Sequence, residues 1–490
     1  MRVNGHTPGH IALPIWKGDG GTRVCGILLY GTMTIGHGIG ALLVLLLIAF
    51  IGVYSGKKVK NASDFVANGR SGGVCLTAGA LVGTLVGGAS TIGTAQLAFT
   101  YGFSAWWFTL GGGIGLFIMA LFFAKPMYQS GHLTLPQMLT AEFGRKTATI
   151  ATLCMSLGTF MSIISQMLSG VALVTSVVDI APLVATGVIV LLMTAYVFFG
   201  GAWGAGMAGV AKTVLLYLAT FICGITALRL GGGVSRFVAD LPHETYFNLF
   251  ARGGWKDGGA GMSLVFGVLT TQSYILPVVS AKNLKTSRQG TILGGVLTII
   301  IGIAGIFVGM FMRLTFPDMD PSGAMPQFVM MYLPDFIGGV ILAVLLVALV
   351  GTGAGLVFGI STMVTKDIYC VFLKPDAPDR AQLRFSRGVI LAVLILAAAI
   401  SAGEAGSLIL SWSFLSMGLR GAVAFAPLCF SLFAPGRVSG RVAAAAIITG
   451  PVLVFVSSFL LPPHIDPLFP GIAGTLLICL LGMRRKVHTC

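Results

Sequence analysis

The sequence carries very little charge for its length. Of 490 residues, only 9% are Asp, Glu, Lys or Arg, and only 15 are acidic, whereas hydrophobic residues make up 56%. A soluble chain of this size would have roughly a quarter of its residues charged. Together with a mean hydropathy of +0.95, this scarcity excludes a set of soluble domains and predicts an all-α polytopic membrane protein.

The residues that build enzyme and metal sites are also scarce. The eight cysteines are dispersed and form no Cys-x-x-Cys pair, so we expect small buried hydrophobic residues rather than disulfides or metal ligands. No His, Cys, Asp or Glu cluster has metal spacing, and no catalytic residue is expected. A membrane sensor module is a remote alternative, because only nine residues follow Leu481 and a signalling domain would need more.

Long apolar runs are abundant instead. A membrane-spanning helix needs about 20 mostly apolar residues. Thirteen such runs occur, at 37–55, 74–99, 105–124, 148–172, 182–200, 210–230, 260–280, 290–312, 337–365, 388–403, 406–434, 442–461 and 468–483. Residues 1–36 form an N-terminal segment without signal-peptide features, compatible with either a disordered tail or a misassigned start before Met33.

The basic residues predict an orientation. When successive loops are placed on alternate sides, 20 of the 30 Lys and Arg residues fall on one side and eight on the other. The richer side is expected to be cytoplasmic, with the N-terminus outside and the C-terminus inside the cell membrane. The formal charge of +15 is thereby explained without a nucleic-acid partner, and the lipid bilayer is the surrounding medium.

Glycine and hydroxyl residues interrupt two of the apolar runs. Residues 83–93 contain four glycines, which favours either a close helix-packing seam or an unwound stretch whose carbonyls bind a cation or a substrate. The second stretch, 349–355, leads to Ser and Thr residues at 361–365. Their oxygens suit a hard cation, or they bond back to their own helix.

A third polar place combines two runs. Gln272, Ser273 and Tyr274 precede Pro277 at the end of the run 260–280. The run 148–172 carries a polar stripe at spacings of 3, 4 and 3, which puts its members on one helical face: Thr159, Ser162, Gln166 and Ser169. We expect this face to contact protein or a cavity rather than lipid.

Short motifs in order along the chain resemble the sodium:solute symporter family. They are 64–70 (DFVANGR), 86–93 (VGGASTIG), 98–102 (AFTYG), 134–136 (TLP), 142–145 (EFGR), 200–201 (GG), Tyr274 with 281–282 (AK), and 365–369 (TKDIY). The resemblance covers about residues 40–480 and implies a five-plus-five inverted repeat of LeuT type. Residues 74–230 would form core repeat 1 and 260–434 core repeat 2. Residues 37–73 would add one helix and a loop, and 442–490 two helices and a tail.

The resemblance also implies the site. Sodium, the expected coupling ion and the only cofactor, would be held by carbonyls of Gly83, Val86 and Ala348 and by the hydroxyl of Thr352, whereas the family's second hydroxyl falls on Gly351. Helices one and six would meet at a midplane substrate site. Its candidate residues, with Tyr274 as an inner gate, are Gly87, Gly88, Ser90, Gln166, Gln272, Tyr274 and Arg420.

Lys212 departs from the family pattern. It replaces the family's glutamine, just after Gly209 replaces an acidic residue, and Pro277 stands where many members have arginine. Lys212 either extends toward the cytoplasmic interface or puts an ammonium in the place of sodium, near helices one, five and eight. The second alternative would make transport proton-coupled or independent of any ion.

Arg420 lies about 14 residues into the run 406–434, too deep to reach the interface easily. An unpaired arginine there costs at least ~2.5–3.5 kcal/mol. It either meets a substrate carboxylate or the aqueous path, or it bonds to backbone carbonyls between helices. The leading hypothesis is cation-coupled symport of a small organic solute, with a carboxylate favoured, by alternating access. The oligomeric state stays open, with a monomer as one alternative.

Overall fold

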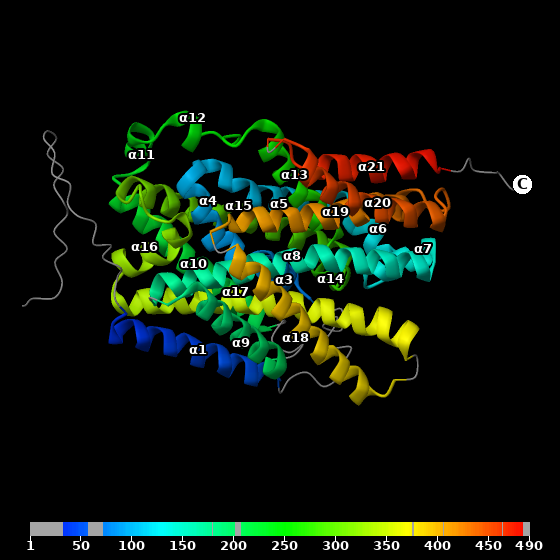
Figure 1. The fold of residues 1–490 in the computed structure, drawn as a ribbon, viewed down its shortest axis with the longest axis horizontal. Coiled ribbons are helices and arrows are strands. Elements are labelled where there is room, and N and C mark those ends of the chain that lie inside the picture. Colours follow the sequence, from blue (N-terminus) through cyan, green and yellow to red (C-terminus); the bar gives the residue numbers. More distant parts are fainter. Residues whose placement is uncertain are drawn as a thin grey trace, which may run out of the picture. The chain divides into compact units, whose positions relative to one another are not determined.

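The computed structural model describes residues 33–56, 72–178, 180–200, 207–374, 377–404, 406–462 and 464–483. The predicted N-terminal segment up to residue 32, the motif 64–70, Gly201 and the tail after Met483 lie outside these residues. The described part is almost entirely helical, and its β pairing consists of the isolated bridges Gly72–Ala281 and Val438–Met483. Most of its long helices lie side by side along one direction (Figure 1).

The first half of the bundle begins with a broken helix. α3 (Val74–Leu85) ends where Val86 adopts an extended backbone, and the chain resumes through a π-helical turn, η2 (Ala89–Gly93), into α4 (Thr94–Tyr101). The elements that follow are η3 (Gly102–Trp106), α5 (Trp107–Ile118), η4 (Met119–Phe123), α6 (Ala124–Gln129), α7 (Leu135–Phe143), α8 (Arg145–Val177), α9 (Pro182–Gly200) and α10 (Met207–Leu230).

The second half contains a bent helix pair. α13 (Gly254–Thr270) and α14 (Gln272–Val279) meet at Thr271 with a bend of 51°. Short helices α11 (Val234–Asp240) and α12 (His243–Tyr246) precede this pair. After it come α15 (Leu284–Thr315), η6 (Pro321–Gly323), α16 (Ala324–Tyr332), α17 (Asp335–Met363), η7 (Val364–Leu373), α18 (Asp379–Gly403) and α19 (Ile409–Phe433).

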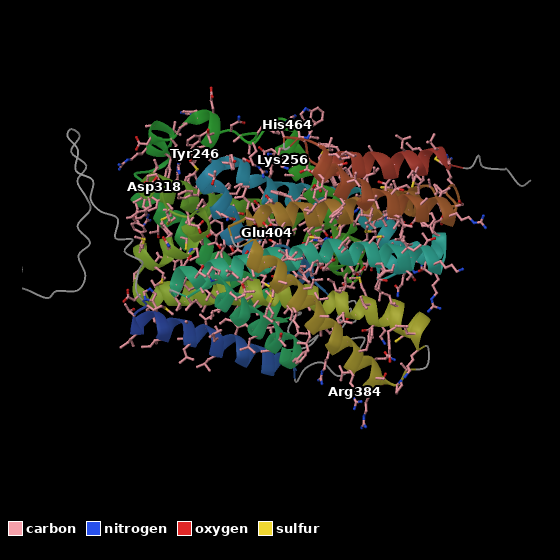
Figure 2. All side chains as sticks on the ribbon, in the orientation of Figure 1. Tyr246, Lys256, Asp318, Arg384, Glu404 and His464 are labelled. Atoms are coloured by element: carbon pink, nitrogen blue, oxygen red, sulfur yellow. The ribbon has the colours of Figure 1, made fainter. Side chains whose placement is uncertain are left out.

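Three helices complete the bundle. α1 (Ile35–Gly56) packs along α17, and glycines make the approach possible, because a Cβ on Gly40 would overlap the Phe336 carbonyl and one on Gly339 the His37 backbone. α20 (Gly440–Leu460) and α21 (Leu468–Leu481) pack on each other and on α19. In Figure 2, Tyr246 and Asp318 lie at the end of the bundle that carries α11, α12 and α16.

Each of the thirteen predicted runs coincides with a helix or with helical pieces joined at a break. Among the described residues, eight helices are long and apolar enough to cross a membrane, and the bent α13–α14 pair makes a ninth. Shorter apolar helices lie at 35–47, 74–85, 182–198 and 468–481. The all-α polytopic class is confirmed, while the number of spans stays a prediction.

The close packing of α15 on the broken helix can be tested at Gly309. A Cβ there would overlap the carbonyl oxygen of Ala95 and lie 2.8 Å from the Phe99 nitrogen, both backbone atoms. We expect Gly309→Ala to destabilise the purified protein by about 1–3 kcal/mol in thermal unfolding. Gly359→Ala is the matched control, because nothing lies within 4 Å of the added carbon. Equal losses in both variants would contradict this packing.

Candidate functional site

The break between α3 and α4 satisfies its backbone with side chains. The Gly87 N–H, which in an unbroken helix would bond to the Gly83 carbonyl, donates to Ser90 Oγ at 2.9 Å. The Gly88 N–H donates to Gln166 Oε1 of α8 at 2.9 Å, and Thr91 Oγ1 donates to the Gly87 carbonyl at 2.9 Å. Polar backbone far from water is thus paired without a continuous helix.

The glycines at this break also bring three helices together. A Cβ on Gly88 would stand 2.6 Å from the Ser169 Cβ of α8, and one on Gly87 would stand 2.9 Å from Thr352 Oγ1 of α17. The sequence left a packing seam and an unwound stretch as alternatives. The structure contains both a break and a packing seam, because Gly87 and Gly88, which follow the end of α3, are the residues that let α8 and α17 approach. α17 itself runs unbroken through Gly351, Gly353 and Gly355.

The second break brings Thr271 toward Arg420. Thr271 has an extended backbone between α13 and α14, and its hydroxyl donates to the Gly267 carbonyl at 2.6 Å. The same hydroxyl accepts from Arg420 Nη1 at 3.1 Å. Tyr274, one turn into α14, is buried.

Arg420 is enclosed by neutral acceptors. The residue is 2% exposed, and its guanidinium makes four hydrogen bonds. Nη2 donates to Ser162 Oγ of α8 at 2.9 Å and to Ser416 Oγ at 2.7 Å, and Nε donates to the Ser416 carbonyl at 3.2 Å. No carboxylate of the described residues lies within 4 Å of it. Arg420 therefore holds three helices together while its charge has no counter-ion in the described part.

These features surround one internal cavity of about 20 Å³, which has room for about one water, so a solute could bind there only if the surrounding helices moved apart. Its walls come from both broken helices and from α5, α8, α17 and α19, and its lining residues are Thr84, Leu85, Phe108, Ser162, Gln166, Tyr274, Thr352, Leu356, Ser413, Met417 and Arg420. Four predicted site residues, Gln166, Tyr274, Thr352 and Arg420, meet here. The sequence-based prediction missed Thr84 and Ser413, although Thr84 lies inside the glycine-rich stretch that drew attention to helix one.

The remaining substrate candidates lie differently. Gly87, Gly88 and Ser90 are not among the residues that line the cavity: Gly87 and Ser90 bond to each other within the break, and the Gly88 N–H bonds to Gln166 of α8. Gln272 does not line the cavity: its Oε1 accepts from the Leu135 N–H at 2.7 Å and its Nε2 donates to the Leu133 carbonyl at 3.1 Å. Its amide instead connects the second break to the start of α7.

Lys212 contacts Thr352, one of the four predicted sodium ligands. The residue is 8% exposed, and its ammonium donates to Thr352 Oγ1 at 2.9 Å. A Cβ added to Gly351 would stand 3.9 Å from Lys212 Cδ, so the side chain passes the position that lacks the second hydroxyl. Ala348, one turn before Thr352, is fully buried. Gly209 belongs to a stretch of α10 whose side chains are not described.

Comparisons with known proteins agree with this architecture. The profile of the sodium:solute symporter family matches residues 65–450. An uncharacterized symporter, YwcA of Bacillus subtilis, is 24% identical over 379 residues, covering 72% of this chain and 73% of the relative. The sodium/pantothenate symporter of Escherichia coli is 24% identical over 466 residues, covering 89% and 93%. The matched region spans 60% of the high-affinity choline transporter 1 of Drosophila melanogaster and 52% of the sodium/myo-inositol cotransporter 2 of Mus musculus.

One solved structure shows the same fold. A Na+-coupled sialic acid symporter in a substrate-bound outward-open state superimposes with a TM-score of 0.73 at 19% identity, covering 91% of this chain and 96% of that one. The predicted LeuT-type architecture is confirmed by this likeness. At this identity the likeness concerns the fold alone.

The hydrogen bond between Gln166 and Gly88 yields a stability prediction. Gln166→Leu leaves the buried Gly88 N–H without its acceptor, which should cost about 1–3 kcal/mol in thermal unfolding. Thr159→Val on the same helix is the control, because the Thr159 hydroxyl donates to Met155 O of its own helix. If both variants lose the same stability, the side chain of Gln166 does not support the break.

Proposed function

The chain belongs to the sodium:solute symporter family, and from this premise we propose that it carries a small carboxylate-bearing solute across the cell membrane by alternating access. The supporting observation is the cavity where both helix breaks meet Gln166, Tyr274 and Arg420. Discontinuous helices at the centre of a bundle are where transporters of this kind bind solutes, because unwound backbone offers donors and acceptors.

A carboxylate suits Arg420 better than its present partners do. Ser162, Ser416 and Thr271 offer the guanidinium neutral oxygens only. A carboxylate can accept two parallel charge-assisted hydrogen bonds, which are roughly twice as strong as neutral ones. The relatives named for pantothenate and sialic acid take solutes that carry a carboxylate, whereas those named for choline and myo-inositol take solutes without one, so the solute class proposed here rests on Arg420.

The proposed cycle uses the arrangement of the helices. Residues 74–230 and 260–434 are proposed as the two repeats, with α1, α20 and α21 added outside them. In this proposal the N-terminus lies outside the cell and the side with more Lys and Arg is cytoplasmic. The solute would enter from the outside, bind between the two helix breaks and leave on the cytoplasmic side. Tyr274, which lines the cavity near the start of α14, is proposed as the inner gate, and Gln272 would release α7 when that side opens.

Sodium is the first candidate for the coupled cation. The carbonyls of Gly83, Val86 and Ala348 and the hydroxyl of Thr352 are its proposed ligands, by position in the family pattern. A second candidate is favoured by the 2.9 Å contact between the Lys212 ammonium and Thr352 Oγ1. There the lysine would take the place of the ion, and transport would be proton-coupled or uncoupled.

Ion replacement distinguishes the two candidates. In proteoliposomes at fixed pH, sodium coupling predicts that solute uptake falls at least about tenfold when sodium is replaced by choline. The solute would then bind without the cation whose binding favours its own. Full uptake in choline would contradict sodium coupling and support the lysine. In that case Lys212→Gln should abolish uptake, whereas Arg313→Gln, a charge change at the end of α15, should not.

Replacing Arg420 by lysine tests the solute class. Lysine keeps the positive charge but loses the two-pronged contact, so we expect the KM for carboxylate solutes such as pantothenate and sialic acid to rise about tenfold or more. Thermal unfolding measured on the same variant separates this loss from loosening of the hydroxyl cluster. Unchanged affinity in Arg420→Lys would contradict a carboxylate contact.

A further inference from the structure

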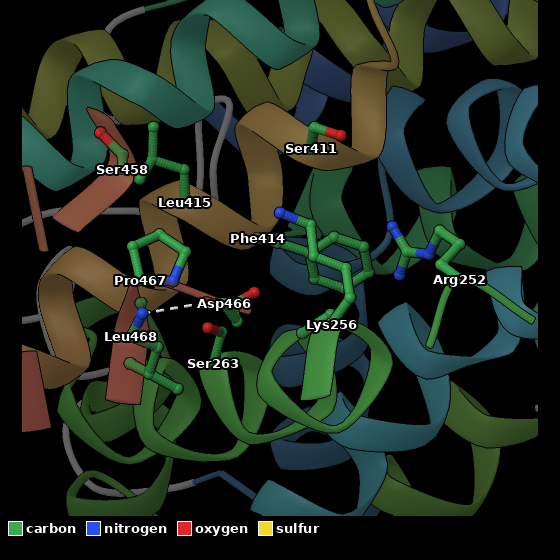
Figure 3. Close-up of a pocket in the computed structure, with 12 residues that line it drawn as sticks. Arg252, Lys256, Ser263, Ser411, Phe414, Leu415, Ser458, Asp466, Pro467 and Leu468 are labelled. Atoms are coloured by element: carbon green, nitrogen blue, oxygen red, sulfur yellow. Dashed lines mark hydrogen bonds between the residues drawn. The ribbon is translucent and has the colours of Figure 1, made fainter. Parts of the chain in front are cut away.

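A second cavity lies apart from the central one, between α13, α19 and the segment that joins α20 to α21. It measures about 200 Å³, and its polar lining comes from Arg252, Lys256, Ser263, Ser411, Ser458 and Asp466. Figure 3 shows Lys256 and Asp466 among the side chains that line this cavity, with the Phe414 ring beside Lys256. At ~30 Å³ per water, it has room for about seven waters, enough for a small solute.

Asp466 is a buried carboxylate with one close partner. The residue is 8% exposed, and its Oδ1 accepts from the Leu468 N–H at 2.9 Å. Burial raises the pKa of its carboxyl, while that hydrogen bond and the nearby Lys256 and Arg252 act in the opposite direction. Within the described chain, neither Asp466 nor Lys256 has an ion-pair partner within 4 Å. The cavity thus contains opposite charges that do not neutralise each other by contact.

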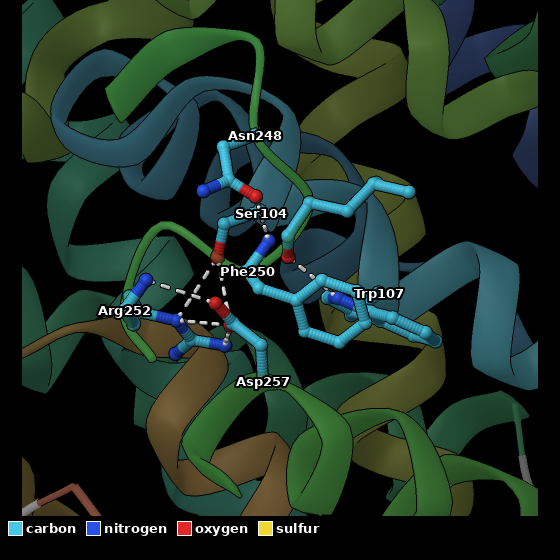
Figure 4. A network of polar contacts seen from close by, with 7 residues as sticks. Ser104, Trp107, Asn248, Phe250, Arg252 and Asp257 are labelled. Carbon is cyan, nitrogen blue, oxygen red and sulfur yellow. Dashed lines mark hydrogen bonds and ion pairs between the residues drawn. The ribbon is translucent and has the colours of Figure 1, made fainter. Parts of the chain in front are cut away.

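Arg252 is engaged elsewhere, which leaves Lys256 as the available cation. Its Nε donates to Asp257 Oδ1 at 2.7 Å and to Ser104 Oγ at 3.1 Å, and its backbone N–H donates to Asp257 Oδ2 at 2.9 Å. Figure 4 shows this network around the start of α13. The guanidinium also lies over the Phe414 ring, 5.4 Å from its centre. Arg252 therefore fixes the start of α13, the helix from which Lys256 projects.

A glycine fixes the position of Asp466. A Cβ on Gly259 of α13 would overlap the Asp466 Cβ and lie 2.7 Å from its Cγ. The backbone of α13 thus approaches the carboxylate as closely as a glycine allows. Since Lys256 projects from the same helix less than one turn earlier, α13 sets the separation of the two charges.

We propose that this cavity binds a small zwitterion of the α-amino acid type. Its carboxylate would lie on Lys256, its ammonium on Asp466, and its apolar part against Phe414 and Leu415. A bound zwitterion supplies the buried Asp466 carboxylate and the half-buried Lys256 ammonium each with an opposite charge within contact distance, which the described chain does not provide, while its own net charge is zero.

The position of this cavity next to the central one suits a site that the solute occupies before it enters the central cavity. We call this second cavity, lined by Lys256 and Asp466, the outer cavity. α19 lines it with Ser411, Phe414 and Gly418 and carries Arg420 two residues further on. The Phe414 ring packs against Phe108 of the central cavity at 5.9 Å between centres, so this aromatic pair separates the two spaces. The role as an entry site rests on the proposed transport function, whereas binding itself does not.

Equilibrium binding tests the proposal. Each of the twenty common amino acids is offered as radiolabelled ligand to the full chain in nanodiscs, in the Arg420→Lys background that weakens the central cavity. At least one amino acid should bind. The amide of that amino acid, which lacks the carboxylate charge, and its desamino analogue, which lacks the ammonium, should each bind at least about tenfold more weakly. Lys256→Gln and Asp466→Asn should each weaken binding to a similar degree, and in Lys256→Gln the amide should bind as well as the acid.

Arg236→Gln is the matched charge control, because Arg236 of α11 does not line the cavity, its side chain is 66% exposed, and it pairs with Asp240. It should bind as the parent does, and thermal unfolding of each variant checks its folding. Absence of binding by all twenty amino acids, or unchanged binding in both Lys256→Gln and Asp466→Asn, would overturn the proposal. Absence of solute uptake by the parent chain, with binding in this cavity intact, would count against the transport function alone.

Discussion

The site depends on one constraint, that backbone N–H groups at the centre of a membrane protein need partners. Where α3 ends, the Gly88 N–H reaches across to Gln166 of α8, and Gly87 bonds with Ser90 of its own segment. A broken helix can persist in an apolar medium only with such partners. Gln166 also lines the central cavity, so the side chain that stabilises the break shapes the space in which a solute would bind.

The same constraint governs the two buried cations. Arg420 and Lys212 lie in the membrane part of the bundle and bond to hydroxyl and carbonyl oxygens rather than to carboxylates of the described chain. Neutral partners compensate only in part for the water that a cation loses on burial. Arg420 is therefore proposed to bind the solute's carboxylate, and Lys212 contacts Thr352, which the family pattern proposes as an ion ligand. The outer cavity, with Lys256 and Asp466, presents a related arrangement nearer the surface.

Much of this could be predicted from the sequence, and the reasons differ from residue to residue. Helix positions follow from apolar runs, because that signal is local, whereas the glycine density at 83–93 left a helix break and a packing seam as alternatives. The stripe through Ser162 and Gln166 predicted an inward face, since helical spacing fixes which residues share a side. Arg420 was recognisable because an arginine so deep in an apolar run is costly.

Contacts between distant segments could not be predicted in this way. Gln272 stands beside a helix break, as a substrate ligand would, yet it bonds to Leu133 and Leu135, about 140 residues earlier in the chain. Lys212 had two alternatives because its position in α10 leaves open whether the side chain reaches Thr352, 140 residues later. No local sequence pattern indicated the outer cavity, because Lys256 and Asp466 line one space only through the packing of α13 against the segment before α21.

The most direct test of the central claim is a structure of the full chain determined with its transported solute bound. The account predicts solute density between the breaks of α3–α4 and α13–α14, with a carboxylate bonded to the Arg420 guanidinium in place of at least one of the Ser162 and Thr271 hydroxyls. Density confined to another part of the bundle, with Arg420 still on the same hydroxyls, would contradict it.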